Sequence, residues 1–282
     1  MVNAGLILEG GGMRGIYTAG VLDCLLEHGI YFENIYGVSA GACHACSYLS
    51  RQKGRGAHTV IDFIGDRHYA GFYSFVTSGD FFGEKMSYHE IPDTLLPFDY
   101  PAFRAKEESL LAVVTNCRSG AAEYLPVSDL KKDMDIIRAS SSLPLLSNLV
   151  KLGNAYYLDG GITDSIPLRK SIRDGNRKNL VVLTQHRGYI KNPNKMLPMV
   201  RRKYRAFPNL VHAVANRHNN YNYSLSLTYR EEAECRAFVI QPKEPVNISR
   251  LEKNKTKLKQ LYRQGYRDAE NQIDALMAFL GH

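Results

Sequence analysis

The amino-terminal part of the chain alternates between short apolar runs and segments whose apolar side chains recur at helical spacing. Residues 6–8 form an apolar run ended by glycines, which predicts a buried parallel strand. Residues 14–28 show helical spacing, and Gly29 is a natural helix stop. A second strand is expected at 34–38, and a second helix, rich in small residues, at 40–49. This β-α-β-α order predicts an α/β fold.

Further apolar segments predict more elements along the rest of the chain. Strands are expected at 109–115, 123–127, 179–184 and 236–241, a hairpin at Gly153-Asn154, and helices at 129–141 and 208–232. The irregular stretch 54–104 predicts helix and loop that cover the sheet. Its aromatic residues between 72 and 82 fit either an acyl-chain groove or ordinary core packing. Residues 249–280 carry an apolar stripe that predicts a helical C-terminal extension.

Composition and charge narrow the class of protein only partly. The chain has 282 residues, of which 44% are hydrophobic and 23% charged, as is typical of a folded protein. No apolar run is long enough to span a bilayer, and the N-terminus lacks the features of a signal peptide. The five cysteines have no framework spacing, so we expect a reducing, cytoplasmic compartment. The net charge of +8 favours an anionic partner, but charge alone does not choose between a membrane surface and nucleic acid.

The segment EGGGMRG at residues 9–15 directly follows the first predicted strand. Gly10, Gly12 and Gly15 satisfy G-x-G-x-x-G between a strand and a helix, which is the context of a dinucleotide-binding loop. Glu33 has the spacing of a ribose-binding acid, yet it begins the second strand, whereas such an acid should end it. A dinucleotide-binding oxidoreductase therefore stays open as an alternative function. A triphosphate-binding loop is disfavoured, because no Gly-Lys-Ser/Thr follows the glycines.

A second motif, Gly37-Val38-Ser39-Ala40-Gly41, lies between the second strand and the second helix. It fits G-x-S-x-G, the sequence of a nucleophile elbow. In such an elbow the serine occupies a sharp, strained turn, and side chains at Gly37 or Gly41 would collide with the neighbouring strand and helix. An ordinary tight turn between a strand and a helix would use the same glycines, so the motif alone leaves both interpretations open.

The glycine loop and Ser39 should emerge at the same edge of the sheet if the first two strands are neighbours. The amides of Gly11, Gly12 and Met13 could then hold the oxyanion that forms when Ser39 attacks a carbonyl group. Preorganised donors of this kind contribute about 3–4 kcal/mol each. Arg14 lies in the first turn of a helix, where the dipole disfavours a cation, so we expect an anionic partner for it, either a carboxylate or a lipid phosphate.

Asp159 ends the predicted hairpin strand and is followed by two glycines. A partly desolvated carboxylate within hydrogen-bond reach of a serine can act as a general base. Asp-Gly-Gly is also common in surface turns, which is the competing interpretation.

The segments Glu9 to Gly15, Gly37 to Gly41 and Asp159-Gly160-Gly161, in this order, resemble the motifs of the patatin-like phospholipase family. Ala139 to Pro144 is similar to the family's Ala-Ser-x-x-x-Pro block. The resemblance covers roughly residues 4 to 185, and three motifs in order are far more specific than any one of them. The family often has an aspartate at the position of Glu9. This difference leaves the expected chemistry unchanged.

The resemblance implies a three-layer α/β/α fold with a mainly parallel sheet, and a Ser-Asp dyad hydrolase that cleaves acyl esters of phospholipids or related lipids. Ser39 would be the nucleophile and Asp159 the general base, without a metal or a cofactor. The oxyanion hole would be formed by the loop residues Gly10, Gly11, Gly12, Met13, Arg14 and Gly15. We expect an acyl hydrolase domain over residues 1–240, with a helical extension over 241–282 packed on it. The expected partners are the lipid substrate and, peripherally, an anionic membrane surface, and no nucleic acid.

Three further hypotheses follow from residues outside these motifs. A Ser-Asp-His triad needs a histidine late in the chain, and His186 or His212 satisfies this order. Cys43 and Cys46 form a C-x-x-C that would allow a redox or metal role, although the small residues around them suit a packed helix. The basic stretch 187–205 contains no acidic residue and fits either a solvated loop or a surface that docks on anionic lipid.

Overall fold

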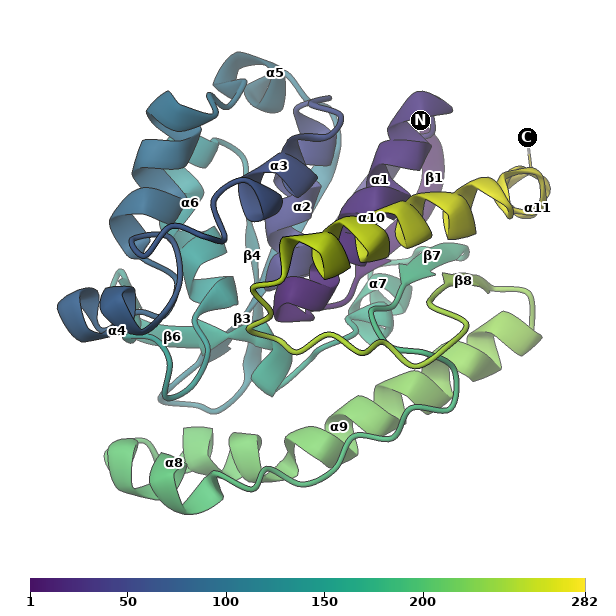
Figure 1. The fold of residues 1–282 in the computed structure, drawn as a ribbon. Coiled ribbons are helices and arrows are strands. Elements are labelled where there is room, and N and C mark those ends of the chain that lie inside the picture. Colours follow the sequence, from purple (N-terminus) through teal and green to yellow (C-terminus); the bar gives the residue numbers. More distant parts are fainter. Residues whose placement is uncertain (282) are drawn as a thin grey trace.

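The computed structural model describes residues 1–281, which form one eight-stranded sheet flanked by helices (Figure 1). The strands are β1 (Val2–Leu8), β2 (Phe32–Val38), β3 (Ser109–Asn116), β4 (Ala122–Pro126), β5 (Val150–Leu152), β6 (Ala155–Asp159), β7 (Asn179–Val182) and β8 (Ala237–Ile240). The longer helices are α1 (Ile16–Glu27), α2 (Ala40–Leu49), α6 (Leu130–Ser141), α9 (Pro208–Ala233), α10 (Lys255–Glu270) and α11 (Ile273–Leu280). The shorter ones are α3 (Arg55–Ile61), α4 (Phe72–Ser78), α5 (Tyr100–Arg104), α7 (Leu168–Arg173) and α8 (Leu197–Lys203), with the π-helix η2 (Met86–Leu95) and the 3-10 turns η1 (Gly12–Gly15) and η3 (Gly160–Ile162). The predicted α/β class is confirmed.

The sheet is parallel at its centre and antiparallel toward one end. The strand order is β5-β6-β3-β2-β1-β7-β8, with β4 paired to β3 off this path. β1 pairs in parallel with β2 on one side and with β7 on the other. β2 in turn pairs in parallel with β3, and β7 pairs in parallel with β8. Leu8 at the end of β1 is in register with Gly37 of β2 and Val182 of β7. The loops that follow these three strands therefore gather at one edge of the sheet.

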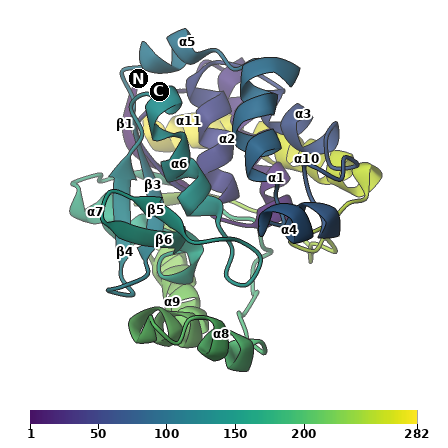
Figure 2. The same cartoon turned by 90° about the vertical axis from the view of Figure 1, so that its left-hand side faces the viewer.

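Helices cover both faces of the sheet and give three layers, as Figures 1 and 2 show. Leu6 and Leu8 of β1 belong to the core on the side of α1, α2 and α10. Ile7 points to the other face and belongs to a second core with Leu168 of α7 and Tyr221 of α9. This alternation follows from the two-residue period of a strand, and a strand covered on both faces reads as a continuous apolar run. The expected α/β/α layering is confirmed.

Strands β2 and β6 end next to each other along one edge of β3. β4 pairs with the middle of β3 and overlaps the registers of both β2 and β6. Because a residue in a strand has one neighbour at each edge, β2 and β6 must share the edge opposite β4. They run toward each other along that edge: Val38 pairs with Val113, and Asp159 pairs with Val114. The residue that follows Val38 is Ser39, so the two strands bring Ser39 and Asp159 to the same place.

The C-terminal helical extension is present as α10 and α11, which are separated by a break at residues 271–272. Helix α10 lies against α1 (Figure 1), and a Cβ on Gly265 would be 2.0 Å from the carbonyl oxygen of Tyr17. The Tyr17 hydroxyl donates a hydrogen bond to Asp268 at 2.9 Å, which ties the two helices together. The domain boundary at residue 240 stays a prediction.

The basic stretch 187–205 is only in part a solvated loop. It contains helix α8, whose basic residues are exposed, whereas Lys191 before the helix is buried. In residues 1–281, no helix combines the length and the apolar character that crossing a membrane requires.

Candidate active site

Ser39 lies between β2 and α2, in the strand–turn–helix context that its motif predicts. Its backbone has φ 54° and ψ −123°, a conformation that is strained for any residue except glycine. A Cβ on Gly37 would lie 2.6 Å from the Cα of Ala42, and one on Gly41 would lie 2.5 Å from the carbonyl oxygen of Leu8. The two glycines therefore let the chain turn sharply, with Ser39 at the edge of the sheet.

A buried hydroxyl group braces this turn from the end of α6. The Ser39 amide donates a hydrogen bond to Oγ of Ser140 at 2.9 Å, and the Ser140 hydroxyl donates to the carbonyl of Val113 at 2.7 Å. Ser140 is completely buried. It belongs to the block from Ala139 to Pro144, so this block ties the strained turn to strand β3.

Asp159 reaches the same place from the opposite direction, at the end of β6. Asp159 is 2% exposed, and its carboxylate accepts a hydrogen bond from the Gly161 amide at 2.6 Å. Burial raises the pKa of Asp159 above its usual value, whereas Arg217, the Ser39 hydroxyl and the Gly161 amide each lower it. The Ser39 side chain thus lies near the carboxylate, and the two predicted residues are both buried at the same place in the fold.

The glycine loop after β1 closes the site from the other side. A Cβ on Gly10 would lie 3.1 Å from the Cβ of Ser39, so the loop and the elbow are in direct contact. Among residues 1–281, no backbone carbonyl accepts a hydrogen bond from the amides of Gly10, Gly11 or Gly12. These three amides are therefore available as donors to a bound group.

The other three residues of the predicted oxyanion loop have different contacts. The Met13 amide donates to the carbonyl of Arg250 at 3.1 Å, and the Arg14 amide donates back into the loop at 3.3 Å. A Cβ on Gly15 would lie 2.5 Å from that of Ala40, so Gly15 lets the first turn of the loop pack on α2. In this structure Met13, Arg14 and Gly15 shape the loop, and their amides are not all free to bind an oxyanion.

Glu9 anchors the glycine loop to the sheet. Its carboxylate accepts hydrogen bonds from the amide and the hydroxyl of Thr184 at 2.6 Å and 3.0 Å, and from the Tyr221 hydroxyl at 2.7 Å. Burial and the charge of Arg250 lower the pKa of Arg14, and Glu9 is the nearby carboxylate that opposes them. Nevertheless, Nε of Arg14 is buried without a hydrogen-bond partner in the described part of the chain.

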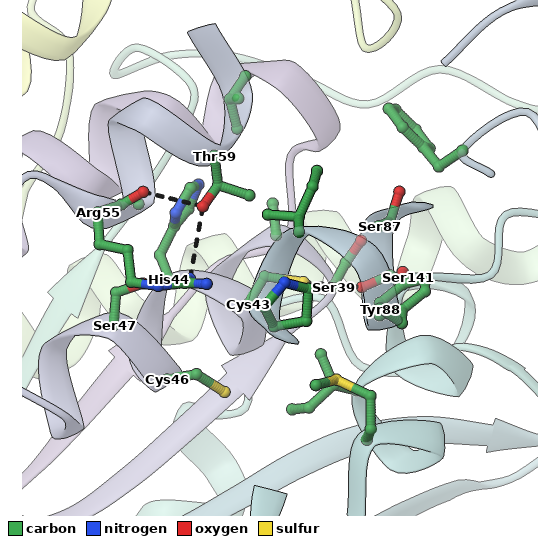
Figure 3. A pocket seen from close by; sticks show the side chains of 18 of the residues that line it. Ser39, Cys43, His44, Cys46, Ser47, Arg55, Thr59, Ser87, Tyr88 and Ser141 are labelled. Atoms are coloured by element: carbon green, nitrogen blue, oxygen red, sulfur yellow. Dashed lines mark hydrogen bonds between the residues drawn. The ribbon is translucent and has the colours of Figure 1, made fainter. Parts of the chain in front are cut away.

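An apolar cavity of about 160 Å³ opens beside Ser39 (Figure 3). Ser39, Cys43, Tyr88 and Ser141 lie together on its wall. The rest of the wall is mainly apolar and includes Val60, Phe82, Ile91, Phe98, Met134 and Ile137 from α3, η2, α6 and the segments between them. The aromatic group between residues 72 and 82 is thus divided: Phe82 lines the cavity, whereas Phe72 is 80% exposed at the surface.

The two histidines considered for a triad are not partners of Asp159 in the described part of the chain. His212 is exposed on α9, and the ring of His186 packs against Tyr189. Within residues 1–281, no histidine is among the groups that hydrogen-bond Asp159. His44 does line the cavity, but burial lowers its pKa to about 4, so it is neutral at physiological pH. The geometry supports a pair, Ser39 and Asp159, more than a triad.

A redox or metal role for the C-x-x-C and a ribose-binding role for Glu33 also lack geometric support. Cys43 and Cys46 are free thiols on α2, burial raises the pKa of each, and Cys43 Sγ contacts Oγ of Ser141 at 3.3 Å. Glu33 lies near the amino end of β2, far along the strand from the glycine loop, whereas a ribose-binding acid belongs at the carboxyl end.

Basic side chains around the site are not indicated by any sequence motif. Arg217 of α9 donates from Nε to the carbonyl of Gly161 and lowers the pKa of Asp159 more than any other group. Lys191 is buried, with its ammonium 3.9 Å from the ring centre of Tyr221. The net positive charge of the chain favours an anionic partner but does not indicate a position for it.

Two family models match this chain. One, described as Patatin-like phospholipase, matches residues 6–171, and the other, described as Domain of unknown function (DUF6363), matches residues 207–281. The first match contains Ser39, Asp159 and the glycine loop, whereas Arg217 lies in the second.

Individual relatives are distant but cover much of the chain. The uncharacterized protein YjjU of Escherichia coli (strain K12) is 27% identical, over 92% of this chain and 74% of its own length. The probable lipid hydrolase 463L of Invertebrate iridescent virus 6 is 25% identical, over 62% of this chain and 65% of its own length. The uncharacterized protein YqhO of Bacillus subtilis (strain 168) is 26% identical, over 57% of this chain and 64% of its own length. The solved structure of VipD from Legionella pneumophila is 12% identical with a TM-score of 0.49, covering 96% of this chain and 67% of VipD.

Replacing the bracing hydroxyl should destabilise the protein. Ser140→Ala is expected to lower the free energy of unfolding by about 1–3 kcal/mol, because it leaves the Ser39 amide unpaired in a buried site. Ser142→Ala is the matched control, since its hydroxyl donates only to the Arg138 carbonyl of the adjoining helix. Calorimetric unfolding measures both variants. Equal stability of the two would show that Ser140 does not hold the turn.

Proposed function

Because the chain belongs to the patatin-like phospholipase family, we propose that it is a serine acyl hydrolase that cleaves ester bonds of phospholipids or related lipids. The family and the relative named as a probable lipid hydrolase both support lipid hydrolase activity. The observation that carries the finer proposal is the meeting of Ser39 and Asp159 along one edge of β3. Ser39 is the proposed nucleophile and Asp159 the proposed general base.

In the first half of the reaction, Asp159 accepts the proton of the Ser39 hydroxyl while Oγ attacks the ester carbonyl carbon. The carbonyl oxygen becomes an oxyanion, which the free amides of Gly10, Gly11 and Gly12 stabilise. The intermediate then collapses, and the bond between the acyl carbon and the alcohol oxygen breaks. The alcohol leaves with the proton from Asp159, and the acyl group stays bound to Ser39 as an ester.

In the second half, a water molecule cleaves this acyl-enzyme. Asp159 takes one proton from the water as its oxygen attacks the acyl carbon, and the same amides hold the second oxyanion. The bond to Oγ of Ser39 breaks, and Oγ recovers the proton from Asp159. The fatty acid is released, and the site returns to its starting state.

The apolar cavity beside Ser39 is the proposed site of the acyl chain (Figure 3). Its wall offers aliphatic and aromatic side chains, such as Ile91, Phe98 and Met134, and begins at the nucleophile itself. Each methylene group buried there would contribute about 0.8 kcal/mol to binding. A fatty acyl ester is therefore favoured over a small polar ester as the substrate.

The dyad assignment predicts that two substitutions abolish activity. Ser39→Ala and Asp159→Asn should each lower the rate of ester hydrolysis by at least about a thousandfold, because one removes the nucleophile and the other the base. Asp164→Asn is the control, since Asp164 is a nearby buried carboxylate that accepts a hydrogen bond from the Tyr124 hydroxyl. Fluorophosphonate labelling with peptide mapping should place the adduct on Ser39. An adduct on another serine, or full activity of either dyad variant, would refute the assignment.

The pKa of Asp159 predicts the direction of a pH effect. Burial raises it and Arg217 lowers it, so Arg217→Gln should raise it further and move the acid limb of kcat/KM to higher pH. The sign follows because only the ionised carboxylate accepts the proton of Ser39. Initial rates with a neutral, soluble acyl ester across a pH series locate the limb. Arg201→Gln, which removes an exposed charge, is the control, and an unshifted limb in Arg217→Gln would contradict the role of Asp159.

We also infer peripheral contact with an anionic membrane surface. Exposed basic residues of α8 have no acidic partner within the described residues, and they are Arg201, Arg202 and Lys203. Exposed apolar side chains lie on α8 itself and on α4, with Met199 56%, Phe72 80% and Val76 65% exposed. Both helices lie on the side of the molecule that is at the left in Figure 1 and faces the viewer in Figure 2. Cations beside apolar side chains suit an anionic lipid surface.

Vesicle binding tests this contact. Vesicles with phosphatidylserine should bind the protein, and binding should weaken as salt is added, because screening reduces the attraction of exposed charges. The double variant Arg201→Gln/Arg202→Gln should bind at least about tenfold more weakly. Lys259→Gln/Arg263→Gln removes two exposed charges from α10 and should bind like the wild type. Salt-independent binding, or equal binding by both double variants, would count against the contact.

A further inference from the structure

Basic side chains gather near Asp159 and the glycine loop, outside the wall of the apolar cavity. They are Arg14, Lys191, Arg217 and Arg250, and the charges of the other three all act on Lys191. The apolar cavity is lined by residues no later in the chain than Leu143, so Lys191, Arg217 and Arg250 lie outside it. The site at Ser39 thus has an apolar side and a cationic side.

The carboxylates near these cations are already occupied. Glu9 accepts hydrogen bonds from Thr184 and Tyr221, and Asp159 accepts one from the Gly161 amide and lies beside Ser39. Within residues 1–281, no ion pair shorter than 4 Å joins Lys191 or Arg250 to a carboxylate. The cluster therefore carries more positive charge than its carboxylates neutralise. Such an excess of charge raises the free energy of a partly buried site unless an anion binds there.

Lys191 is fixed in its buried position by helix α9. The Asn222 side chain accepts a hydrogen bond from the Lys191 amide at 2.9 Å and donates one to its carbonyl at 3.1 Å. The Lys191 side chain lies on the ring of Tyr221 and is 8% exposed. Burial, Arg217 and Arg250 together lower the pKa of Lys191 to about 6. An anion next to it would restore the charged form.

Arg217 and Arg250 lie against the two segments that form the site, the turn after Asp159 and the glycine loop. Arg217 binds the carbonyl of Gly161 beside Asp159. The Arg250 carbonyl accepts a hydrogen bond from the Met13 amide, and a Cβ on Gly12 would lie 2.7 Å from that carbonyl oxygen. Arg217 and Arg250 belong to the region that matches the domain of unknown function, outside the match to the phospholipase model.

We propose that Lys191, Arg217 and Arg250 bind a phosphate group on the alcohol side of the acyl ester that Ser39 attacks. This inference rests on the proposed function, and it assigns head-group recognition to the C-terminal region. The acyl chain enters the apolar cavity while the phosphate meets the cations, so the ester bond between them is held at Ser39. A phosphate suits the site, because its oxygens can accept hydrogen bonds from several cationic donors at once.

Direct binding tests the subsite without catalysis. Isothermal titration calorimetry of the full chain with glycerol phosphate and with inorganic phosphate should detect saturable binding, and glycerol should give none. Lys191→Met and Arg250→Gln should each weaken binding at least about tenfold, as expected for the loss of a charged partner. Lys195→Gln removes an exposed lysine of the same stretch and should bind like the wild type. Absence of phosphate binding, or unchanged affinity in both Lys191→Met and Arg250→Gln, would overturn the proposal.

Substrate preference tests which source of phosphate the subsite serves. The wild type should favour a monoacyl glycerol phosphate over the monoacylglycerol of the same chain length, and Lys191→Met should lower this ratio of kcat/KM at least about tenfold. Equal losses on both substrates would indicate a structural role and overturn the proposal. Binding of inorganic phosphate without any effect on the ratio would overturn head-group recognition. If the acyl hydrolase assignment itself fails, neither ester is cleaved at Ser39, while the calorimetric result still reports on the subsite.

Discussion

The structure depends on one geometric constraint, the shared edge of strand β3. β2 arrives at this edge in parallel and β6 arrives antiparallel, so their carboxyl ends meet. The meeting point holds Ser39 and Asp159, which are far apart in the sequence. Neither residue needs a long loop to reach the other, because the sheet register places both. Rigid strands position reacting groups more accurately than flexible loops do.

The electrostatics of the site follow from its burial. Asp159 is buried, which raises its pKa and would favour the neutral acid if no other group opposed it. Arg217 opposes this effect from α9, and the hydrogen bond of the Gly161 amide adds to that opposition. A carboxylate balanced in this way can be ionised and still basic, which suits a proton acceptor. The region after residue 207 is therefore electrostatically coupled to Asp159, the proposed base, which precedes it in the chain.

Much of the fold and the proposed dyad could be predicted from local sequence. The strand at 109–116 contains a continuous apolar run, the helix at 40–49 directly follows the elbow motif, and Gly37 and Gly41 mark the sharp turn at Ser39. The class of fold and the family followed from these local signals. The assignment of Ser39 and Asp159 as catalytic residues stays a proposal.

The cationic side of the site could not be predicted in this way. Arg217 and Arg250 approach Asp159, and Lys191 approaches these two arginines, only through the packing of α9 and of the segment before α10. Nothing in their local sequence distinguishes the three from solvated basic residues. Helix α8 was missed for a related reason, since its basic sequence lacks an apolar stripe. The hydrogen bond from the Met13 amide to the Arg250 carbonyl is likewise a tertiary contact that no motif indicates.

A crystal structure of the protein after reaction with a long-chain alkyl fluorophosphonate would show whether Ser39, Asp159 and the glycine loop form one catalytic site. We expect a covalent bond from Oγ of Ser39 to phosphorus, with Asp159 beside that oxygen. We further expect a phosphonyl oxygen that faces the amides of Gly10 to Gly12, and the alkyl chain in the cavity lined by Ile91 and Met134. A phosphonyl oxygen turned away from the glycine loop, with Asp159 out of reach of Ser39, would contradict this arrangement.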